Sequence, residues 1–150
     1  MQNFLYSIAI LVMTMSCKAP QSATDTFQEN QKIVESIDSI KWRLVKIYTD
    51  SHTISVSTKA FIRMDKSKGS AGGNGSCNSF GSTMKLEGNA ISFTNIFSTK
   101  IYCDEVQSIE NAFLGHLQKV TRYEIKGKTL SLFNGDRLLL EFEKDSAAKS

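Results

Sequence analysis

The sequence predicts an α+β fold made mainly of antiparallel strands, with one helix packed on the sheet. From residue 41 onward, most apolar side chains alternate with polar ones, which is the period of a half-buried strand. Tight turns separate these short segments, and such turns join antiparallel neighbours. One segment, at about 104–119, has helical spacing instead. We expect a curled sheet or partly open barrel with this amphipathic helix against it.

The length and composition fit one globular domain. The chain has 150 residues, of which 41% are hydrophobic and 22% charged. Its net charge of +3 is uneven, because residues 1–16 carry no charge, 17–40 are net acidic and 41–150 are net basic. Lysines and arginines form no run of four, and no aromatic-basic pattern of RNA-binding domains is present, so nucleic acid is not a predicted partner.

The chain begins with an apolar run, 4–15, that ends in Ser16 and Cys17. The run is shorter than the roughly 20 residues that a membrane-spanning helix needs, but it suits the apolar part of a secretory signal. A small residue before a cysteine is what lipoprotein processing requires. We therefore expect residues 1–16 to be a lipoprotein signal peptide and Cys17 to be lipidated. Soluble secretion and an uncleaved anchor are the alternatives.

Residues 17–40 are predicted to be the lipidated cysteine and a flexible tether, because Ser, Thr, Gln, Asn, Asp and Glu dominate them. A short helix over 27–37 is the alternative. Lys18, and not an aspartate, follows the cysteine, which by the sorting rule of enteric lipoproteins favours the outer membrane. The predicted location is the cell envelope, with a lipid anchor in the outer membrane.

The first strand is expected to begin at Trp42. Its apolar positions are Trp42 and Leu44, and they then shift to Val45 and Ile47, as a bulge requires. A second strand is expected at 61–64. Later strands are expected to form hairpins around three short turns, namely 87–89, 126–128 and 134–136. The last strand, 138–142, is predicted to alternate strictly, with Leu139 on the side away from the apolar face.

The helical segment carries an apolar stripe spaced three and four residues apart: Val106, Ile109, Phe113, Leu117 and Val120. Asp104 is a candidate N-cap, and Glu105 lies favourably in the first turn. Glu110 lies beside the stripe and is expected to hydrogen-bond to a neighbouring strand.

The segment 69–81 is rich in glycine but matches no nucleotide-binding pattern. It lacks the Gly-Lys-Ser/Thr end of a phosphate-binding loop, and Asn78 stands where a dinucleotide fingerprint needs its third glycine. We interpret it as a strand with close backbone approaches that leave no room for side chains.

Cys77 and Cys103 are an even pair in a chain predicted to be exported, where disulfides are favoured. A disulfide, two buried free thiols and a reactive thiol remain open at this point. Catalysis by a cysteine and a histidine would have to use His52 or His116, and the latter is expected to interact with the helix C-terminus. No spacing fits a zinc site and no paired carboxylates suggest acid–base catalysis, so no catalytic residue, metal or cofactor is predicted.

These motifs, in this order, resemble the META domain (HslJ-like) family over residues 41–143, which leaves 144–150 as a polar tail. The residues that carry the resemblance are Trp42, Gly75, Cys77, Asn78, Thr99, Cys103 and Glu110, with Phe113, Leu117 and the final strands. Ser76 stands where the family usually has a second glycine.

The resemblance implies a curled antiparallel sheet with one helix, an envelope role, and a link to stress or antibiotic tolerance. It brings no catalytic residues. We therefore predict a lipid-anchored, non-enzymatic structural or binding module. Its partners would be the membrane, through the anchor, and an envelope protein or small apolar ligand. An exported thiol enzyme using Cys77 or Cys103, and a carrier of an apolar ligand, are the alternatives.

Overall fold

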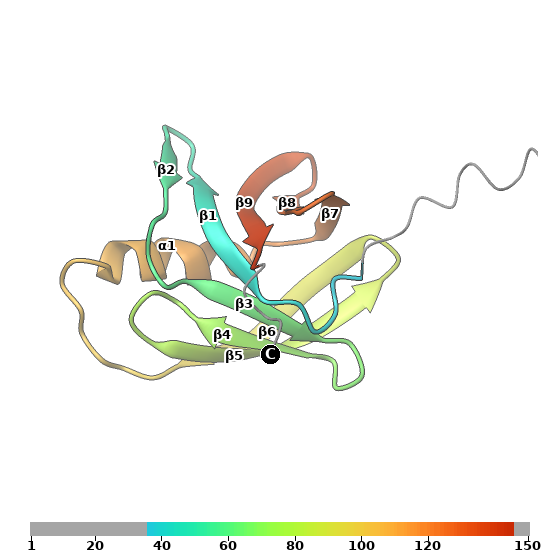
Figure 1. Ribbon diagram of the computed structural model, residues 1–150, viewed down its shortest axis with the longest axis horizontal. Coiled ribbons are helices and arrows are strands. Elements are labelled where there is room, and N and C mark those ends of the chain that lie inside the picture. The colour runs from blue at the N-terminus through green and yellow to red at the C-terminus, as the bar shows by residue number, and fades with distance from the viewer. Residues whose placement is uncertain (1–35, 146–150) are drawn as a thin grey trace, which may run out of the picture. The chain divides into compact units, whose positions relative to one another are not determined.

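The computed structural model describes residues 36–145, so the predicted signal peptide, Cys17 and most of the predicted tether lie outside the described residues. Nine strands and one helix lie within that range (Figure 1). In chain order they are β1 (Trp42–Tyr48), β2 (Thr53–Ser55), β3 (Phe61–Asp65), β4 (Ser70–Asn74), β5 (Ser79–Glu87), β6 (Ala90–Ser98), α1 (Gln107–Leu117), β7 (Arg122–Lys126), β8 (Thr129–Asn134) and β9 (Arg137–Lys144). No helix in this range is long and apolar enough to span a bilayer.

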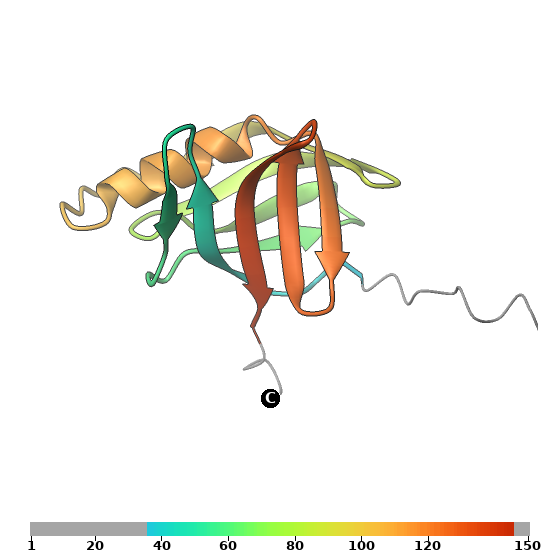
Figure 2. The ribbon, with the colours of Figure 1, turned by 90° about the horizontal axis from the view of Figure 1, so that it is seen from above.

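All neighbouring strands are antiparallel, in the order β2-β1-β3-β4-β5-β6-β7-β8-β9, and β1 also pairs with β9. The strand order therefore returns to its own start. Figure 2 shows the result: β1, β9, β8 and β7 form one wall, β3 to β6 lie behind it, and α1 runs along one end. The pairing around the ring is least extensive between β6 and β7, where the one register pair is Ala90 with Arg122. The predicted α+β, mainly antiparallel class is confirmed.

The core fills the space between the two walls and the helix. Its largest fully buried side chains include Trp42 on β1, Phe113 on α1 and Phe142 on β9. The Phe113 ring meets Phe80 and Phe142 edge-on, with ring centroids 5.5 and 5.8 Å away. The helix thus joins β5 to β9 through one aromatic cluster, and truncating Phe113 to alanine would cost about 3–5 kcal/mol.

Several predicted elements are confirmed. The register of β1 against β9 shifts between Leu44 and Lys46, which is the predicted bulge. The hairpin turns also fall where they were predicted, and Gly88 between β5 and β6 has φ +60°, a conformation that favours glycine. The glycine-rich segment forms β4 and the start of β5, and a side chain at Gly72 would come within 2.9 Å of the Phe80 carbonyl oxygen. The close approach predicted for this strand is therefore present.

The predicted start and capping of the helix were wrong. α1 begins at Gln107, after an N-cap at Val106 that has no side-chain hydrogen bond. Asp104 instead accepts a hydrogen bond from the Tyr102 hydroxyl at 2.9 Å. The backbone carbonyl of Cys103 takes the capping role, since it accepts the N–H groups of Val106 and Gln107.

The predicted outward position of Leu139 was also wrong. Leu139 is buried, because the β8–β9 register shifts next to it, between Leu132 and Phe133, and this bulge turns two successive β9 side chains inward. The folded part also begins before residue 41. Ile37 is buried, and its carbonyl accepts a hydrogen bond from the Trp42 indole at 3.2 Å.

Candidate functional site

The turn between β4 and β5, residues 75–78, is the centre of the candidate site. The Gly75 amide donates to the Asn78 carbonyl at 2.7 Å, and the Asn74 side chain accepts the Ser76 amide at 3.0 Å. Ser76 has φ +127°, a backbone conformation that residues other than glycine rarely adopt. Its hydroxyl lies 2.7 Å from the hydroxyl of Thr58. A Cβ at Gly75 would lie 2.7 Å from a Glu110 carboxylate oxygen, so position 75 has room only for glycine.

Glu110 lies in the first helical turn of α1, and its side chain reaches the connection between β4 and β5; it is only 3% exposed. Its Oε2 accepts the backbone amides of Cys77 at 3.1 Å and Asn78 at 2.7 Å, while its Oε1 accepts the Asn78 side-chain amide at 2.6 Å. Glu110 was predicted to hydrogen-bond to a neighbouring strand, whereas its partners lie in the turn between β4 and β5. Three donors around one carboxylate are what a buried charge of this kind requires.

Asn78 connects this carboxylate to the segment between β6 and α1. Its Oδ1 accepts the Thr99 hydroxyl and the Ile101 amide, both at 2.8 Å, and its Nδ2 also donates to the Ile101 carbonyl at 2.8 Å. Both backbone polar groups of Ile101 are therefore bonded to one buried side chain. Thr99, Asn78 and Glu110 are linked in the sequence only by the family resemblance, and the structure brings them together.

A disulfide joins Cys77 to Cys103, with Cα atoms 6.0 Å apart. This is one of the three states that the sequence left open. The bond fastens the β4–β5 turn to the residue whose carbonyl begins α1. The turn, the start of the helix and residues 99–103 are thus held together by one covalent bond and a buried polar network.

An exposed stretch lies on the outside of this network. Phe97, Ile101 and Tyr102 are 71%, 63% and 75% exposed. A hollow of about 320 Å³ opens beside them, and its lining includes Asn78, Tyr102 and Gln107. The candidate site is therefore a rigidly held surface with a shallow polar and apolar hollow.

Two other predicted residues lie away from this surface. Trp42 is fully buried in β1, where it is a core residue. His116, in the last turn of α1, bonds to the Ala112 carbonyl through Nδ1 and to the Tyr48 carbonyl through Nε2, at 2.8 and 3.0 Å. His116 was predicted to interact with the helix C-terminus, whereas its ring bonds to a carbonyl within the helix and ties α1 to β1.

The remaining histidine, His52, is exposed in the β1–β2 turn, with the Ser51 hydroxyl 2.9 Å from its Nδ1. Within residues 36–145, no group of three or more His, Cys, Asp or Glu side chains is arranged to hold a metal ion.

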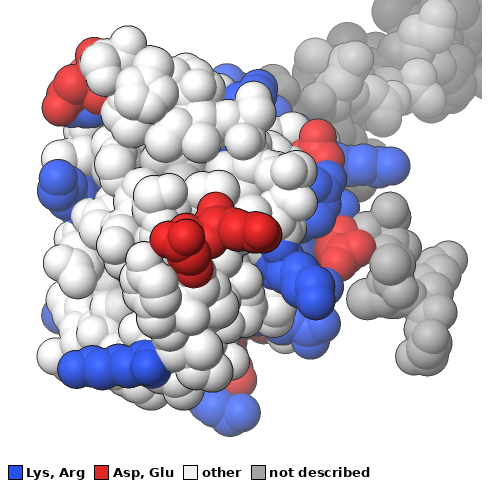
Figure 3. Space-filling model, turned by 90° about the vertical axis from the view of Figure 1, so that its left-hand side faces the viewer, with Lys and Arg blue, Asp and Glu red and all other residues white. Residues whose placement is uncertain are grey.

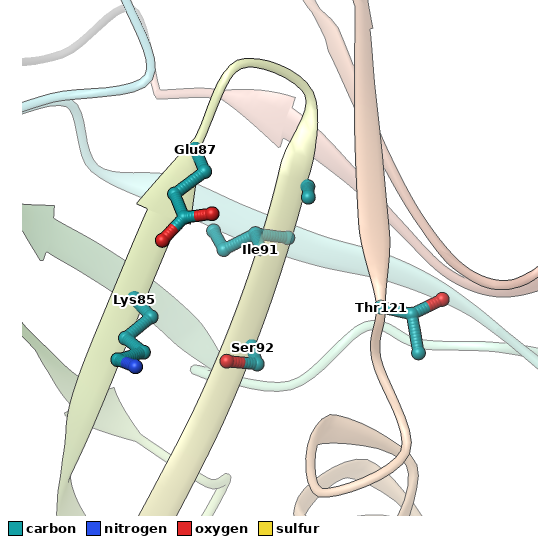
Figure 4. Close-up of a pocket in the computed structure, with 6 residues that line it drawn as sticks. Lys85, Glu87, Ile91, Ser92 and Thr121 are labelled. Atoms are coloured by element: carbon teal, nitrogen blue, oxygen red, sulfur yellow. The ribbon is translucent and has the colours of Figure 1, made fainter.

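Another hollow, of about 290 Å³, lies where β6 separates from the chain that leads into β7 (Figure 4). Lys85 and Glu87 come from β5, Ile91 and Ser92 from β6, and Thr121 from the chain before β7. Lys85 stands opposite Ser92 in the register. The hollow is open and holds one lysine and one carboxylate that project from the same strand, an arrangement that offers no orienting partner for a nucleophile.

The fold and this site define a class: a small, mainly antiparallel domain in which one helix and a disulfide hold a surface segment rigid. The family model described as "META domain" matches residues 35–147, and the chain belongs to that family. The match begins before residue 41, in agreement with the buried position of Ile37.

Two solved structures have a similar fold. The NMR structure of a protein from Burkholderia xenovorans is 20% identical, covers 73% of this chain and 84% of its own, and has a TM-score of 0.61. The crystal structure of a DUF4847 family protein from Bacteroides vulgatus is 16% identical, covers 74% and 96%, and has a TM-score of 0.55. No curated protein matches the chain.

Sequence reasoning missed the most exposed part of the site. Phe97 is an exposed residue of β6, while Ile101 and Tyr102 follow no strand or helix period, and the sequence contains many apolar residues that are buried. A usable signal was present for Ile101 and Tyr102, because they lie between the last strand residues and the helical stripe, in a connection. Large apolar residues in a connection are candidates for a binding surface.

Proposed function

We propose that the protein is a non-enzymatic binding module of the bacterial envelope, anchored by lipid at Cys17. The observation that carries the binding role is the segment 97–102, which holds three large apolar side chains in solvent on a rigid support. The anchor rests on the sequence alone, on the apolar run that ends in Ser16 and Cys17.

The rigid support favours the interpretation that the exposed apolar side chains bind a partner. Because Asn78 bonds both backbone polar groups of Ile101, the side chain of Ile101 can point only away from the network. A surface that is already ordered before binding loses little conformational entropy when it binds. An exposed apolar segment with no such support would lose more.

The alternative of a thiol enzyme is less well supported. Both sulfur atoms of the pair are joined to each other, and a disulfide has no thiolate with which to attack a substrate. Glu110 is occupied by three donors, so it is not free to act as a base toward a bound molecule. The hydrogen bonds of His52 and His116 lead to hydroxyl groups and carbonyls.

The alternative of an apolar-ligand carrier requires space between sheet and helix. That space contains Phe80, Phe113 and Phe142 in edge-on contact, together with fully buried leucines. The hollows beside residues 97–102 and beside β6 are open to solvent. This arrangement favours binding on the surface.

Intact mass of the protein from the membrane fraction tests the anchor. We expect a chain that begins at Cys17 and carries acyl groups, and a Cys17→Ser variant that moves to the soluble fraction. The matched control is the double variant Cys77→Ser/Cys103→Ser, which we expect to remain acylated. An unmodified wild-type chain in the soluble fraction would overturn the anchor.

Thiol titration tests the non-enzymatic role. After denaturation without reductant, we expect no free thiol from Cys77 or Cys103, and two after reduction. Two thiols that react quickly in the native, unreduced protein would favour the thiol enzyme.

The proposal includes a role in stress or antibiotic tolerance, which rests on the family resemblance. A strain that produces only the Cys17→Ser variant should then survive heat or antibiotic no better than a strain without the protein. Equal survival of the wild-type and deletion strains under each stress would remove this part of the proposal.

A further inference from the structure

The exposed apolar side chains are concentrated in one short stretch. In the described part of the chain, the large hydrophobic residues that stand out as exposed are Phe97, Ile101 and Tyr102, all within six consecutive positions. We call residues 97–102, which comprise the end of β6 and the first part of the connection to α1, the apolar loop. Lys100 within it is exposed as well. Single exposed apolar residues are ordinary on protein surfaces, but three of this size in one loop indicate a contact surface.

The loop is held in place at both ends. The Phe97 ring lies over Gly81, where an added Cβ would come within 2.5 Å of the ring, so a glycine makes room for it. The Thr99 amide donates to the Ser79 carbonyl at 3.1 Å, and Cys103 is fixed by its disulfide. The exposure of the apolar side chains therefore follows from an ordered backbone.

The charges around the loop determine which surface it suits. Lys100 contributes one positive charge, whereas Asp104 and Glu105, which are also exposed, contribute two negative charges directly after the loop. Figure 3 shows the side of the molecule that carries the start of α1: its middle is mostly uncharged with a small acidic group, and basic side chains lie around its edge. A strongly anionic partner would be repelled by the acidic pair, so an electrically neutral surface fits better.

The size of the loop argues against a protein partner. Aromatic side chains bury about 150–250 Å² each, so three large apolar side chains offer a few hundred Å². A stable protein interface buries about 800 Å² on each partner. By contrast, tyrosine, phenylalanine and aliphatic side chains are suited to the boundary between lipid headgroups and acyl chains, where a few of them are enough for weak, reversible contact.

The tether makes such weak contact sufficient, because it keeps the domain close to the membrane. Eighteen residues separate Cys17 from Ser36, and at about 3.3 Å per residue they reach at most about 60 Å. A domain of about 110 residues is about 35 Å across. Any face of the domain can therefore reach the membrane that holds the anchor, and the tether keeps the local concentration of that membrane high.

We infer that the apolar loop, residues 97–102, is a membrane-contact surface that inserts Phe97, Ile101 and Tyr102 into a zwitterionic phospholipid surface. The inference rests on the proposed function for the local concentration that the anchor supplies. It assigns the polar network of Asn78 and Glu110 the task of holding this surface ready for insertion.

Vesicle flotation tests the inference without the acyl chains. The mature chain with Cys17→Ser is mixed with phosphatidylcholine/phosphatidylethanolamine vesicles at millimolar lipid. We expect measurable binding that falls at least fivefold in Ile101→Glu. Replacing part of the lipid with anionic phosphatidylglycerol should not raise wild-type binding by more than about twofold.

The matched control is Thr53→Glu, which adds the same charge at an exposed position on β2 and should bind as the parent chain does. Thermal unfolding of each variant checks that the fold is kept. As a second measurement, Tyr102→Trp should give a blue-shifted emission component when vesicles are added, because its indole enters the interface.

Three outcomes would overturn the inference. They are no binding of the parent chain at millimolar lipid, equal binding of Ile101→Glu, or a dimer in solution that Ile101→Glu dissolves while vesicles stay empty. The last would identify the loop as a contact between two copies. Since the acyl chains are absent, failure here leaves the Cys17 anchor untouched, and failure of acylation leaves the flotation result unchanged.

Discussion

The bonds of the single residue Asn78 explain why the site places a side-chain amide next to the Glu110 carboxylate. Its Nδ2 donates to Glu110 and to Ile101, and its Oδ1 accepts from Thr99 and Ile101. Both donors and both acceptor positions of the amide are therefore used. An aspartate would place a second buried negative charge beside Glu110, and a leucine would remove all the bonds that the Asn78 side chain makes to Glu110, Thr99 and Ile101.

Glu110 provides the first prediction. In Glu110→Gln, the new amide nitrogen must face one or more of the three donors that now point at the carboxylate. A buried donor without a partner costs about 1–3 kcal/mol, and the bonds to the lost charge are stronger than neutral ones. We expect the free energy of unfolding to fall by about 2–3 kcal/mol, measured by urea denaturation.

The control for this variant is Glu105→Gln, an exposed residue two positions before the start of α1. Its free energy of unfolding should change by less than about 0.5 kcal/mol. If the two variants are equally stable, the hydrogen bonds to the buried Glu110 carboxylate make no measurable contribution to stability.

Ser76 provides the second prediction. Its φ of +127° is a conformation that side chains rarely adopt, which gives a physical reason for the glycine expected there from the family resemblance. Ser76→Gly and Ser76→Ala both remove the hydroxyl that meets Thr58, so their difference isolates the backbone. We expect the glycine variant to be more stable than the alanine variant by about 1 kcal/mol in urea denaturation.

Gly115 is the matched control, because it lies inside α1 and a Cβ there would meet nothing within 4 Å. There the order should reverse, with Gly115→Ala more stable than wild type by about 0.5–1 kcal/mol. An alanine at position 76 that is as stable as glycine would mean that the backbone there is not strained.

At the scale of elements, the sequence predicted what depends on local pattern. Alternation identified β1, β3, β5 to β9 and the bulge after Leu44, and turn glycines such as Gly88 identified the hairpins. It did not predict β2, which has three residues, or the second bulge beside Leu139. Both depend on a neighbouring strand, and a pattern within one segment does not contain its neighbour's register.

The start of α1 was missed for a related reason. Asp104 satisfies the usual preference for an N-cap, but the disulfide holds Cys103 and the Asn78 bonds hold Ile101. The carbonyl of Cys103 then reaches the free amides, and Asp104 turns to Tyr102. The same long-range bonds hold the backbone of Ile101 in place, and a local pattern does not contain them.

The disulfide joins two elements, the β4–β5 turn and the start of the helix. It gives the third prediction. Closing a loop of about 27 residues stabilises the fold by about 3.5 kcal/mol on the chain-entropy estimate. Asn78 and Glu110 hold the same segments without it. The double variant Cys77→Ser/Cys103→Ser should therefore lose up to about 3.5 kcal/mol but remain folded.

Circular dichroism and urea denaturation of this variant measure both parts. Wild-type protein with reductant is the matched comparison and should lose a similar amount. A variant that is unfolded at 25 °C without urea would mean that the polar network cannot hold the helix start alone.

At the scale of the whole molecule, the first and last strands close the ring. β1 pairs with β9 over five register positions, and two ion pairs cross that seam, an exposed one at Arg43–Glu143 and a partly buried one at Lys46–Glu141. Tyr48 joins the second pair by donating its hydroxyl to Glu141 at 3.1 Å. The helix, the core and the apolar loop depend on this seam, because opening it would expose Trp42 and Phe142.

The seam gives the last prediction, a loss of stability at alkaline pH. The hydrogen bond and charge of Glu141 raise the pKa of Lys46 above 10.5, and burial, followed by the Glu141 charge, raises the pKa of Tyr48 above 10.0. Both groups hold their protons more firmly in the folded state. Their contribution is therefore complete below pH 10 and is lost as the pH rises through the raised values. The midpoint temperature of unfolding, followed from pH 8 to 11.5, should fall less steeply in Glu141→Gln than in wild type. Glu143→Gln is the control on the same strand: its partner Arg43 keeps its charge over this range, so the wild-type slope should remain. Equal slopes in all three proteins would show that the closure of the ring does not depend on these protons.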